Sequence, residues 1–248
     1  MQAVILAAGK GKRLLPLTED LPKGMLPING KPLLQIILEQ LKAVNIGEVI
    51  FIVNFCQEKI INYFGDGSKF GVKISYVRQK ERKGTADAVL QAERVVTGDK
   101  FVCIACDSLF ENSLLPRLLS NSSKANGVIT CREVSDTKGY GVLRLAPDKS
   151  NLPSSNPAFN QVLEIVEKPE QAPSNLANFS VYLFPREIFA ACQKVKPSAR
   201  GELEINDAIK MLIDSGQQFT YVKSQDIIDI GTFEQLSEAN GIDKRLRL

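Results

Sequence analysis

Short apolar runs alternate with segments of helical period through the first half of the chain. Residues 3–6 form a continuous apolar run that ends in glycines, which is typical of a buried parallel strand. After Pro32, apolar residues recur at helical spacing over 33–44, and Asn45-Ile46-Gly47 ends this helix. The same pattern predicts strands over 49–53, 72–77, 101–105 and 127–131, and helices over 57–64, 85–96 and 114–119. Strands that alternate with helices predict an α/β fold with a mostly parallel sheet and helices on both faces.

The pattern changes at about residue 132, where glycines and prolines become frequent and the polar stretch 147–157 is typical of a loop. Beyond this point we expect strands near 141–145, 161–166, 181–184, 219–222 and 227–230, and helices over 188–195, over 204–215 and from Phe233. The simplest interpretation is a single domain over 1–248. In it, about 132–230 form an inserted lobe that covers a ligand, and 231–248 form a C-terminal helix.

Histidine is absent from the 248 residues. This excludes Ser-His-Asp and Cys-His catalysis, His-ligated zinc and any imidazole acid or base. The chemistry therefore depends on carboxylates, lysines, arginines, backbone amides or a hard metal ion. The five cysteines are an odd number, which argues against a disulfide framework. Cys103-x-x-Cys106 lacks the further ligands of a zinc site, so we expect two core cysteines on opposite faces of a strand.

Net charge and hydropathy limit which partners and which cellular location are expected for this protein. The net charge of +3, from 31 basic and 28 acidic residues, is too small to indicate nucleic acid as a partner. No stretch approaches the roughly 20 apolar residues that a membrane-spanning helix needs, so no membrane partner is expected. The apolar residues 1–8 have no basic leader, which favours a cytoplasmic protein over a secreted one.

The first predicted strand opens into Gly9-Lys10-Gly11-Lys12-Arg13. Glycines at this place let backbone N–H groups approach a phosphate, and the neighbouring cations neutralise its charge. The dinucleotide-binding pattern fails because Leu14 occupies the third glycine position, and the Walker A pattern fails because its Lys-Ser/Thr pair is absent. Taken alone, the loop is either a phosphate site or a tight turn with solvated basic residues.

The residues around and after this loop resemble the sugar-1-phosphate nucleotidylyltransferases, and the resemblance covers nearly the whole chain. The motifs that carry it occur in the order Gly9-x-Gly11-x-Arg13-Leu14-x-Pro16-Leu17-Thr18, Pro22-Lys23-x-Met25-Leu26-Pro27-Ile28, 64–68, Gly84-Thr85-Ala86, Tyr140-Gly141-Val142, Glu167-Lys168-Pro169, Gly201-Glu202-Leu203-Glu204-Ile205 and Asp229-Ile230-Gly231-Thr232. The stretch 196–205 is particularly similar to glucose-1-phosphate thymidylyltransferases.

The resemblance implies a Rossmann-like three-layer sandwich with a mixed, mostly parallel central sheet and an inserted sugar-binding lobe. Residues 1–131 would bind the nucleotide, and 132–230 the sugar phosphate. The implied reaction joins UTP or dTTP to a sugar 1-phosphate, with glucose 1-phosphate the first candidate, and releases pyrophosphate. A nucleoside triphosphate and a sugar 1-phosphate are thus the expected partners, Mg²⁺ is the expected cofactor, and a homo-oligomer stays open. Because the attacking phosphate oxygen is already an anion, no histidine base is required.

The resemblance also assigns roles to individual residues. The nucleotide is expected at Leu6, Ala8, Gly9, Gly11, Gln79, Gly84 and Thr85. Arg13 would neutralise the leaving pyrophosphate, and Lys23 would contact the α-phosphate. The sugar phosphate is expected at Gly141, Glu167, Lys168 and Asn178, with Lys168 on its phosphate and counted among the catalytic cations. Asp107 and Asp229 would hold Mg²⁺.

Gln79 lies five residues before Gly84, where uridylyl- and thymidylyltransferases read the pyrimidine with a glutamine amide. An amide can pair with an oxygen and an N–H on one base edge, which suits uracil or thymine. Gln79 therefore argues against one alternative, a mannose-1-phosphate guanylyltransferase. A second alternative is a catalytically silent regulatory subunit, but such a subunit has no need for both metal aspartates.

Several positions depart from the family pattern. Ser108 follows the first metal aspartate where asparagine is frequent, Ser180 replaces a usual glycine, Asn206 replaces a usual threonine, and Ile227 stands where thymidylyltransferases often have tryptophan. None of these departures removes a charged catalytic group. They leave the identity of the sugar open.

Overall fold

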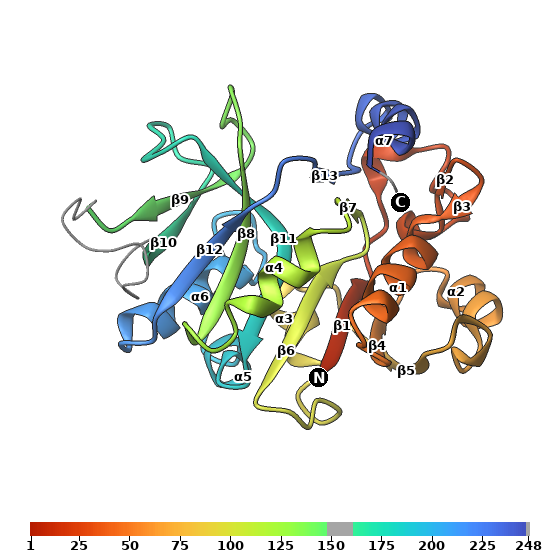
Figure 1. Ribbon diagram of the computed structural model, residues 1–248, viewed down its shortest axis with the longest axis horizontal. Coiled ribbons are helices and arrows are strands. Elements are labelled where there is room, and N and C mark those ends of the chain that lie inside the picture. Colours follow the sequence, from red (N-terminus) through yellow and green to blue (C-terminus); the bar gives the residue numbers. More distant parts are fainter. Residues whose placement is uncertain (148–160, 247–248) are drawn as a thin grey trace.

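The computed structural model describes residues 1–147 and 161–246 (Figure 1). Within these residues, nine strands form one sheet in the order β5-β4-β1-β6-β11-β8-β12-β10-β9. The strands of this sheet are β1 (Gln2–Ala7), β4 (Glu48–Val53), β5 (Lys73–Arg78), β6 (Lys100–Ala105), β8 (Gly127–Glu133), β9 (Gly141–Leu145), β10 (Gln161–Glu167), β11 (Leu176–Pro185) and β12 (Phe219–Lys223). Apart from Pro147, the predicted loop 147–157 lies outside the described residues.

The helices and the remaining short strands surround this sheet. The helices are α1 (Leu33–Ala43), α2 (Gln57–Phe64), α3 (Thr85–Leu90), α4 (Leu114–Ser120), α5 (Ile188–Cys192), α6 (Ile205–Asp214) and α7 (Phe233–Leu246), with short 3₁₀ helices at Lys12–Leu14, Lys23–Met25 and Ser68–Phe70. The short strands are β2 (Pro27–Ile28), which pairs with β3 (Lys31–Pro32), and β7 (Ser108–Leu109), which pairs with β13 (Ile228–Asp229). Within the described ranges, no helix combines the length and apolar character that crossing a membrane requires.

The sheet is mixed, as predicted. β5, β4, β1 and β6 are mutually parallel, and β12 is parallel to β8. β11 is antiparallel to both β6 and β8, and β10 is antiparallel to both β12 and β9. β11 and β10 therefore run against the other strands, and the sheet is mostly parallel in direction.

Helices cover both faces of the sheet because alternate strand residues point to opposite sides. In β1, Ile5 belongs to a buried cluster that includes α1, α2 and α4, whereas its neighbour Val4 belongs to a second cluster that includes α3, α5 and α6. Figure 1 shows α1 and α4 in front of the sheet and α5 and α6 behind it. Cys103 lies in the second cluster and Cys106 in the first, and both are buried free thiols. The predictions of three layers and of two core cysteines are confirmed.

The last five strands in the sheet order, β11-β8-β12-β10-β9, form a closed arrangement because β9 also pairs with β11. Besides its pairing with β10, β9 contacts β11, with Val142 opposite Ala177. Gly141 at the start of β9 is opposite Glu167 at the end of β10. The closure therefore brings the starts of β9 and β11 and the end of β10 to one place. The expected lobe is thus a curled continuation of the central sheet.

Some predicted elements differ in extent from the observed ones. The helix predicted over 85–96 ends at Leu90, after which consecutive turns carry the chain through 91–95 while Ala92 and Val96 stay buried. A helical period of burial therefore continues while most backbone bonds in this stretch change from the i→i−4 to the i→i−3 pattern. The strand predicted over 181–184 extends from Leu176 to Pro185. Its first half contains Asn178 and Ser180, whose polar side chains interrupt the apolar pattern.

Substitution of Phe101 tests how much the buried cluster that includes α3, α5 and α6 contributes to the stability of the protein. Its side chain is fully buried and its ring stacks on Phe189, with centroids 5.2 Å apart. We expect Phe101→Ala to lower the free energy of unfolding by about 3–5 kcal/mol, because it leaves a cavity. The matched control Phe233→Ala removes a ring that is 45% exposed, and should change stability by less than about 0.5 kcal/mol. Urea denaturation measures both, and equal losses would contradict this assignment of the core.

Candidate functional site

Two adjoining cavities lie where the predicted site residues gather. The first, of about 620 Å³, is lined by every residue predicted to bind the nucleotide. The second, of about 390 Å³, is lined by Gly141, Glu167 and Asn178 from the predicted sugar side. The two cavities share part of their walls, namely Arg13, Thr85, Asp107, Ser180, Tyr182, Ile205, Asp229 and Gly231. They therefore form one continuous cleft, with both predicted metal ligands at the junction.

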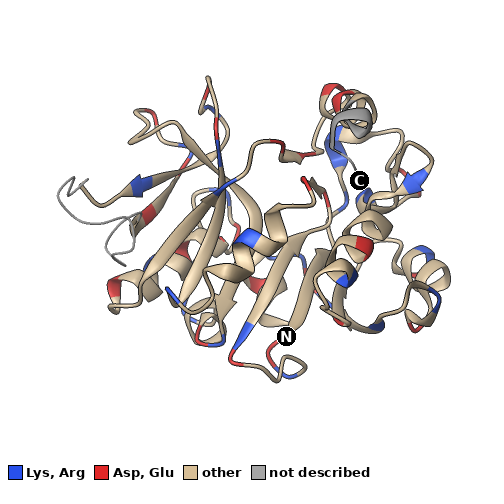
Figure 2. Cartoon of the chain, viewed as in Figure 1, with Lys and Arg blue, Asp and Glu red and all other residues tan. Residues whose placement is uncertain are grey.

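The glycine loop forms one end of the first cavity. It follows β1 directly, and Gly11 has φ 65°, a left-handed conformation that costs a glycine little. The fully buried Thr18 donates its hydroxyl to the Gly11 carbonyl at 2.8 Å, which holds the loop in this shape. Lys10, Lys12 and Arg13 also line the cavity. Figure 2 shows that, in this view, basic and acidic residues are otherwise interspersed along the chain.

A short ladder brings the two aspartates together. β7 pairs with β13 so that Ser108 is opposite Asp229, and the Ile230 N–H donates to the Asp107 carbonyl at 2.8 Å. The Ser108 hydroxyl donates to Asp229 Oδ1 at 2.7 Å. Asp107 therefore follows the end of β6 while Asp229 approaches it from a segment more than a hundred residues further along. The Ser108 departure from the family pattern supplies a hydrogen bond to a predicted metal ligand.

The pKa values of Asp229 and Lys23, which lie at this junction, are both raised. Burial raises the pKa of Asp229 to about 7, and the charge of Asp107 adds to the rise, whereas Ser108 and Lys23 oppose it. Lys23 forms an ion pair with Asp107 Oδ2. Burial alone would lower the pKa of Lys23, but Asp107 outweighs it and the pKa of Lys23 is raised. Two close carboxylates with one ammonium leave this part of the cleft in need of positive charge.

This donor set fits a hard divalent cation. Mg²⁺ is usually held by one or two carboxylates together with substrate phosphates and water. The contacts described above use only Oδ2 of Asp107 and Oδ1 of Asp229, so each carboxylate keeps a second oxygen. Within 1–147 and 161–246, no group of three or more His, Cys, Asp or Glu side chains could hold a metal. A cation held by these two carboxylates would take its remaining ligands from substrate phosphates and water.

Gln79 also lines the first cavity and is 3% exposed. Its Nε2 donates to Asp87 Oδ2 at 2.7 Å and to the Gly84 carbonyl at 3.2 Å. Both amide hydrogens are therefore used inside the protein. The expected two-point pairing of this amide with a base edge is not available in this conformation, because only Oε1 is left for a ligand.

Gly84 and Thr85 connect the two sides of the cleft. A Cβ on Gly84, whose φ is 130°, would lie 2.4 Å from the Leu203 carbonyl oxygen, so the close approach of these backbones requires glycine. The Ala86 N–H donates to that same carbonyl at 2.9 Å, and Thr85 Oγ1 accepts from the Ile205 N–H at 3.0 Å. The start of α3, on the first cavity, is thus bonded to the start of α6, on the second.

A chain of hydrogen bonds orders the second cavity. Arg200 Nη2 donates to Glu167 Oε1 at 2.9 Å, and Asn206 Nδ2 donates to Glu167 Oε2 at 2.8 Å. Asn206 Oδ1 then accepts from Asn178 Nδ2 at 3.3 Å, and the same Nδ2 donates to the Tyr182 hydroxyl at 2.8 Å. Because a carboxylate only accepts, each amide in the chain has one possible orientation. Asn178 Oδ1 is buried and lacks a partner among the described residues.

Lys168 lies beside this arrangement and is not among the residues that line either cavity. Its Nζ is 3.9 Å from Glu167 Oε1, its side chain is 43% exposed, and its φ is 44°. A left-handed conformation is uncommon for a lysine. The role predicted for Lys168 on the sugar phosphate stays a prediction, as do the roles of the other site residues.

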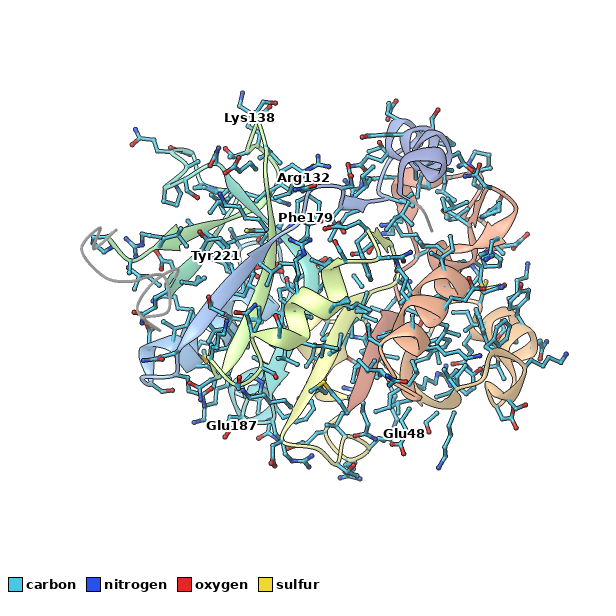
Figure 3. All side chains as sticks on the ribbon, in the orientation of Figure 1. Glu48, Arg132, Lys138, Phe179, Glu187 and Tyr221 are labelled. Atoms are coloured by element: carbon cyan, nitrogen blue, oxygen red, sulfur yellow. The ribbon has the colours of Figure 1, made fainter. Side chains whose placement is uncertain are left out.

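Several residues of the cleft do not stand out in the sequence. Tyr182 sits in an apolar strand and resembles a core residue in sequence, although its hydroxyl meets Asn178. Asn206 stood out only as a departure from the family pattern, and Arg200 only as part of a motif. Lys138, which Figure 3 labels at the tip of the segment between β8 and β9, also lines the second cavity. A polar residue at the start of a helix that follows a matched motif was the available signal for Asn206.

Together, a glycine loop after the first strand, strand-end aspartates and a second sugar-sized cavity define a nucleotide-binding α/β protein with room for a second substrate. The model of the nucleotidyl transferase family matches residues 2–245. The chain belongs to this family, and the resemblance predicted from its motifs is confirmed.

Relatives and solved structures agree with this. The chain is 37% identical over 243 residues to the UTP–glucose-1-phosphate uridylyltransferase AglF of Haloferax volcanii, covering 96% of this chain and 95% of AglF. It is 40% identical to the bifunctional protein GlmU of Methanocaldococcus jannaschii, but covers only 47% of that protein, with 86% of this chain aligned. A solved UDP-glucose pyrophosphorylase in complex with UDP-glucose superposes with a TM-score of 0.85 at 26% identity, covering 98% of both chains.

Asn206 tests the ordered second cavity. Asn206→Leu removes both bonds of an asparagine that is 7% exposed, so Glu167 keeps only Arg200 and Asn178 keeps only Tyr182 as the partners described above. We expect the KM for the sugar phosphate to rise about tenfold, which corresponds to one or two buried hydrogen bonds. The KM for the nucleotide should stay unchanged. Initial-rate kinetics with each substrate varied in turn measures both values.

The control for this variant is Asp207→Asn, which changes the exposed neighbour of Asn206 on α6. It should leave both KM values unchanged. If Asn206→Leu left the KM for the sugar phosphate unchanged, or raised both KM values equally, Asn206 would have no role in ordering the second cavity.

Proposed function

We propose that this protein transfers a uridylyl group from UTP to glucose 1-phosphate, forming UDP-glucose and releasing pyrophosphate. The observation that carries this proposal is the continuous cleft, in which the residues predicted for a nucleotide and those predicted for a sugar meet at Asp107 and Asp229. The match to AglF over nearly the whole length of both chains supports UTP and glucose 1-phosphate as substrates. The similarity to a UDP-glucose pyrophosphorylase supports the same pair.

The proposed reaction needs positioning more than it needs acid–base groups. A phosphate oxygen of the sugar phosphate attacks the α-phosphorus, and pyrophosphate leaves from the opposite side. Two polyanions repel each other strongly in a site with little water, so cations must hold them in line. Lys23 would contact the α-phosphate, Arg13 the departing pyrophosphate, and the glycine loop the remaining phosphate oxygens.

Mg²⁺ would be held by Asp107 and Asp229 and would supply charge neutralisation between the two substrates. The ion pair of Lys23 with Asp107 keeps both groups at the junction before substrates arrive. In the proposed complex, the Lys23 ammonium exchanges the carboxylate for a phosphate oxygen. Asp107 is then free to act as a ligand.

Other substrates within the class stay as alternatives. A Bacillus anthracis protein assigned as a glucose-1-phosphate thymidylyltransferase superposes with a TM-score of 0.86 at 28% identity, covering all of this chain, which supports dTTP as a second nucleotide. An amino-sugar phosphate and the pair of GTP with mannose 1-phosphate are further candidates. The silent-subunit alternative is disfavoured because Arg13, Lys23, Asp107 and Asp229 are all present. Magnesium dependence, a cytoplasmic location and a homo-oligomer belong to this proposal.

The direct test measures pyrophosphate release over a grid of substrates. UTP, dTTP, GTP, CTP and ATP are each combined with glucose, mannose, galactose and glucosamine 1-phosphates, with and without Mg²⁺. We expect Mg²⁺-dependent release to peak with UTP and glucose 1-phosphate. A maximum with GTP and mannose 1-phosphate would replace the proposed substrates, and no release from folded protein would favour the silent subunit.

Lys23 provides a prediction about the chemical step. Because charge builds on the α-phosphate only in the transition state, Lys23→Ala should lower kcat by about a hundredfold with little change in KM. The control Lys31→Ala removes an exposed lysine whose ion-pair partner is Glu39, and should leave kcat unchanged. A rise in KM alone for the Lys23 variant would assign this lysine to substrate binding.

Asp229 provides a prediction about the metal. Asp229→Asn should lower turnover by about a hundredfold or more while thermal unfolding stays cooperative, because one ligand of the cation is lost. The remaining activity should require a higher Mg²⁺ concentration for half-saturation. Asp226→Asn, an exposed neighbour that lines neither cavity, is the control. Unchanged Mg²⁺ dependence in the Asp229 variant would remove this residue from the metal site.

A further inference from the structure

A glutamine side chain can read two different pyrimidine edges. With Oε1 toward the ring N3, it accepts a hydrogen bond from the imino N–H of uracil or thymine. Rotated by 180°, it places Nε2 there and donates to the bare N3 of cytosine. A glutamine that is free to rotate therefore binds both kinds of base, and discrimination requires that something fix the amide.

In this protein, two hydrogen-bond acceptors of the protein itself fix the orientation of the Gln79 amide. Nε2 carries two hydrogens, and these go to Asp87 Oδ2 at 2.7 Å and to the Gly84 carbonyl at 3.2 Å. A carbonyl oxygen and a carboxylate accept hydrogen bonds and have none to donate. Neither could bond Oε1 if the amide rotated. Rotation would bring two oxygens into contact and leave Oε1 between two acceptors.

The backbone of Gln79 is also held in place. Its N–H donates to the Val53 carbonyl at 3.0 Å, and its carbonyl accepts from Asn54 Nδ2 at 2.6 Å. The side chain lines the first cavity, and no donor among the described residues is bonded to its Oε1. The atom that this side chain offers to a ligand is therefore an acceptor.

Asp87 itself is positioned by the first turn of α3. It is the third residue of the helix that begins at Thr85, and Gln91 Nε2 donates to its Oδ1 at 3.3 Å and to its carbonyl at 3.1 Å. Asp87 lines neither of the two cavities, so it acts on a ligand only through Gln79. Its two carboxylate oxygens are divided between Gln91 on one side and Gln79 on the other.

We propose that Asp87 is the positioning residue that sets base specificity, because it locks the Gln79 amide with Oε1 toward the base so that uracil is accepted and cytosine rejected. The inference rests on the proposed function, since it assigns a pyrimidine to the first cavity. Uracil presents an N–H at N3 and forms the hydrogen bond. Cytosine presents a lone pair at the same atom and repels Oε1, which leaves two buried acceptors without a partner.

The test compares the dissociation constants of UTP and CTP, measured by calorimetry on the full chain and on variants. Asp87→Asn keeps the shape of the side chain, but its amide can either accept from or donate to Gln79, so the Gln79 amide is released. We expect the preference for UTP over CTP to fall about tenfold, mainly through tighter CTP binding. Asp87→Ala, which leaves the amide with only its longer bond to the Gly84 carbonyl at 3.2 Å, should give the same shift.

A double variant separates positioning from a general structural effect. In a Gln79→Met background there is no amide to orient, so adding Asp87→Asn should leave the UTP to CTP ratio unchanged. The matched control is Gln35→Met, which removes a glutamine that is bonded to a carboxylate, Glu39 at 2.9 Å, but lines neither cavity. It should keep the ratio of the unmodified protein.

The outcomes separate the two proposals. An unmodified protein that binds UTP and CTP equally, or an Asp87→Asn variant that weakens both nucleotides by the same factor, would overturn the role of Asp87. So would a ratio that still changes in the Gln79→Met background. Binding that follows the expected ratios, without pyrophosphate release from any sugar 1-phosphate, would uphold the role of Asp87 and reject the proposed transfer reaction.

Discussion

The pairing of β7 with β13 is the contact on which the site depends. It consists of two residue pairs, yet it holds Asp107 and Asp229 together at the junction of the two cavities. Burial is the largest cause of the raised pKa of Asp229, and repulsion between the two close carboxylates adds to it. The backbone bond from Ile230 to Asp107, the Ser108 hydroxyl and the Lys23 ammonium offset the repulsion. The cleft is thus held in an arrangement that a cation would stabilise.

Much of the fold could be predicted from the apolar pattern, since buried parallel strands are nearly uninterrupted runs. Residues 3–6, 49–53 and 101–105 are such runs, and each is a strand of the sheet. The extents of α3 and β11 could not be predicted in the same way. The helical period of burial continues past α3 into turns whose backbone bonds are mostly of the i→i−3 type. The first half of β11 faces the cleft with polar residues. Local periodicity reports burial, and burial does not fix which backbone hydrogen bonds are made.

For the site, the motifs located the residues but not the bonds between them. The glycine loop, Gln79 and the two aspartates could all be named from the sequence, and all line the cleft. The ladder between β7 and β13 could not be foreseen, because strands of two residues have no detectable pattern. Nor could the orientations of Gln79 and Asn178, which are set by Asp87 and Asn206. The orientation of a side-chain amide depends on whether its neighbours in the fold donate or accept hydrogen bonds, and the sequence does not show which residues those neighbours are.

The bonds between the starts of α3 and α6 have a consequence for the evolution of this protein. Gly84 packs against Leu203, and Thr85 accepts from Ile205, so the loop at the first cavity and the helix that lines the second share one backbone support. A substitution that shifts the start of α6 and so reshapes the second cavity also moves the loop that contains Gly84. Mutations on the two sides of the cleft are therefore not additive. We expect new preferences at the two cavities to arise as linked traits, through compensating pairs of changes.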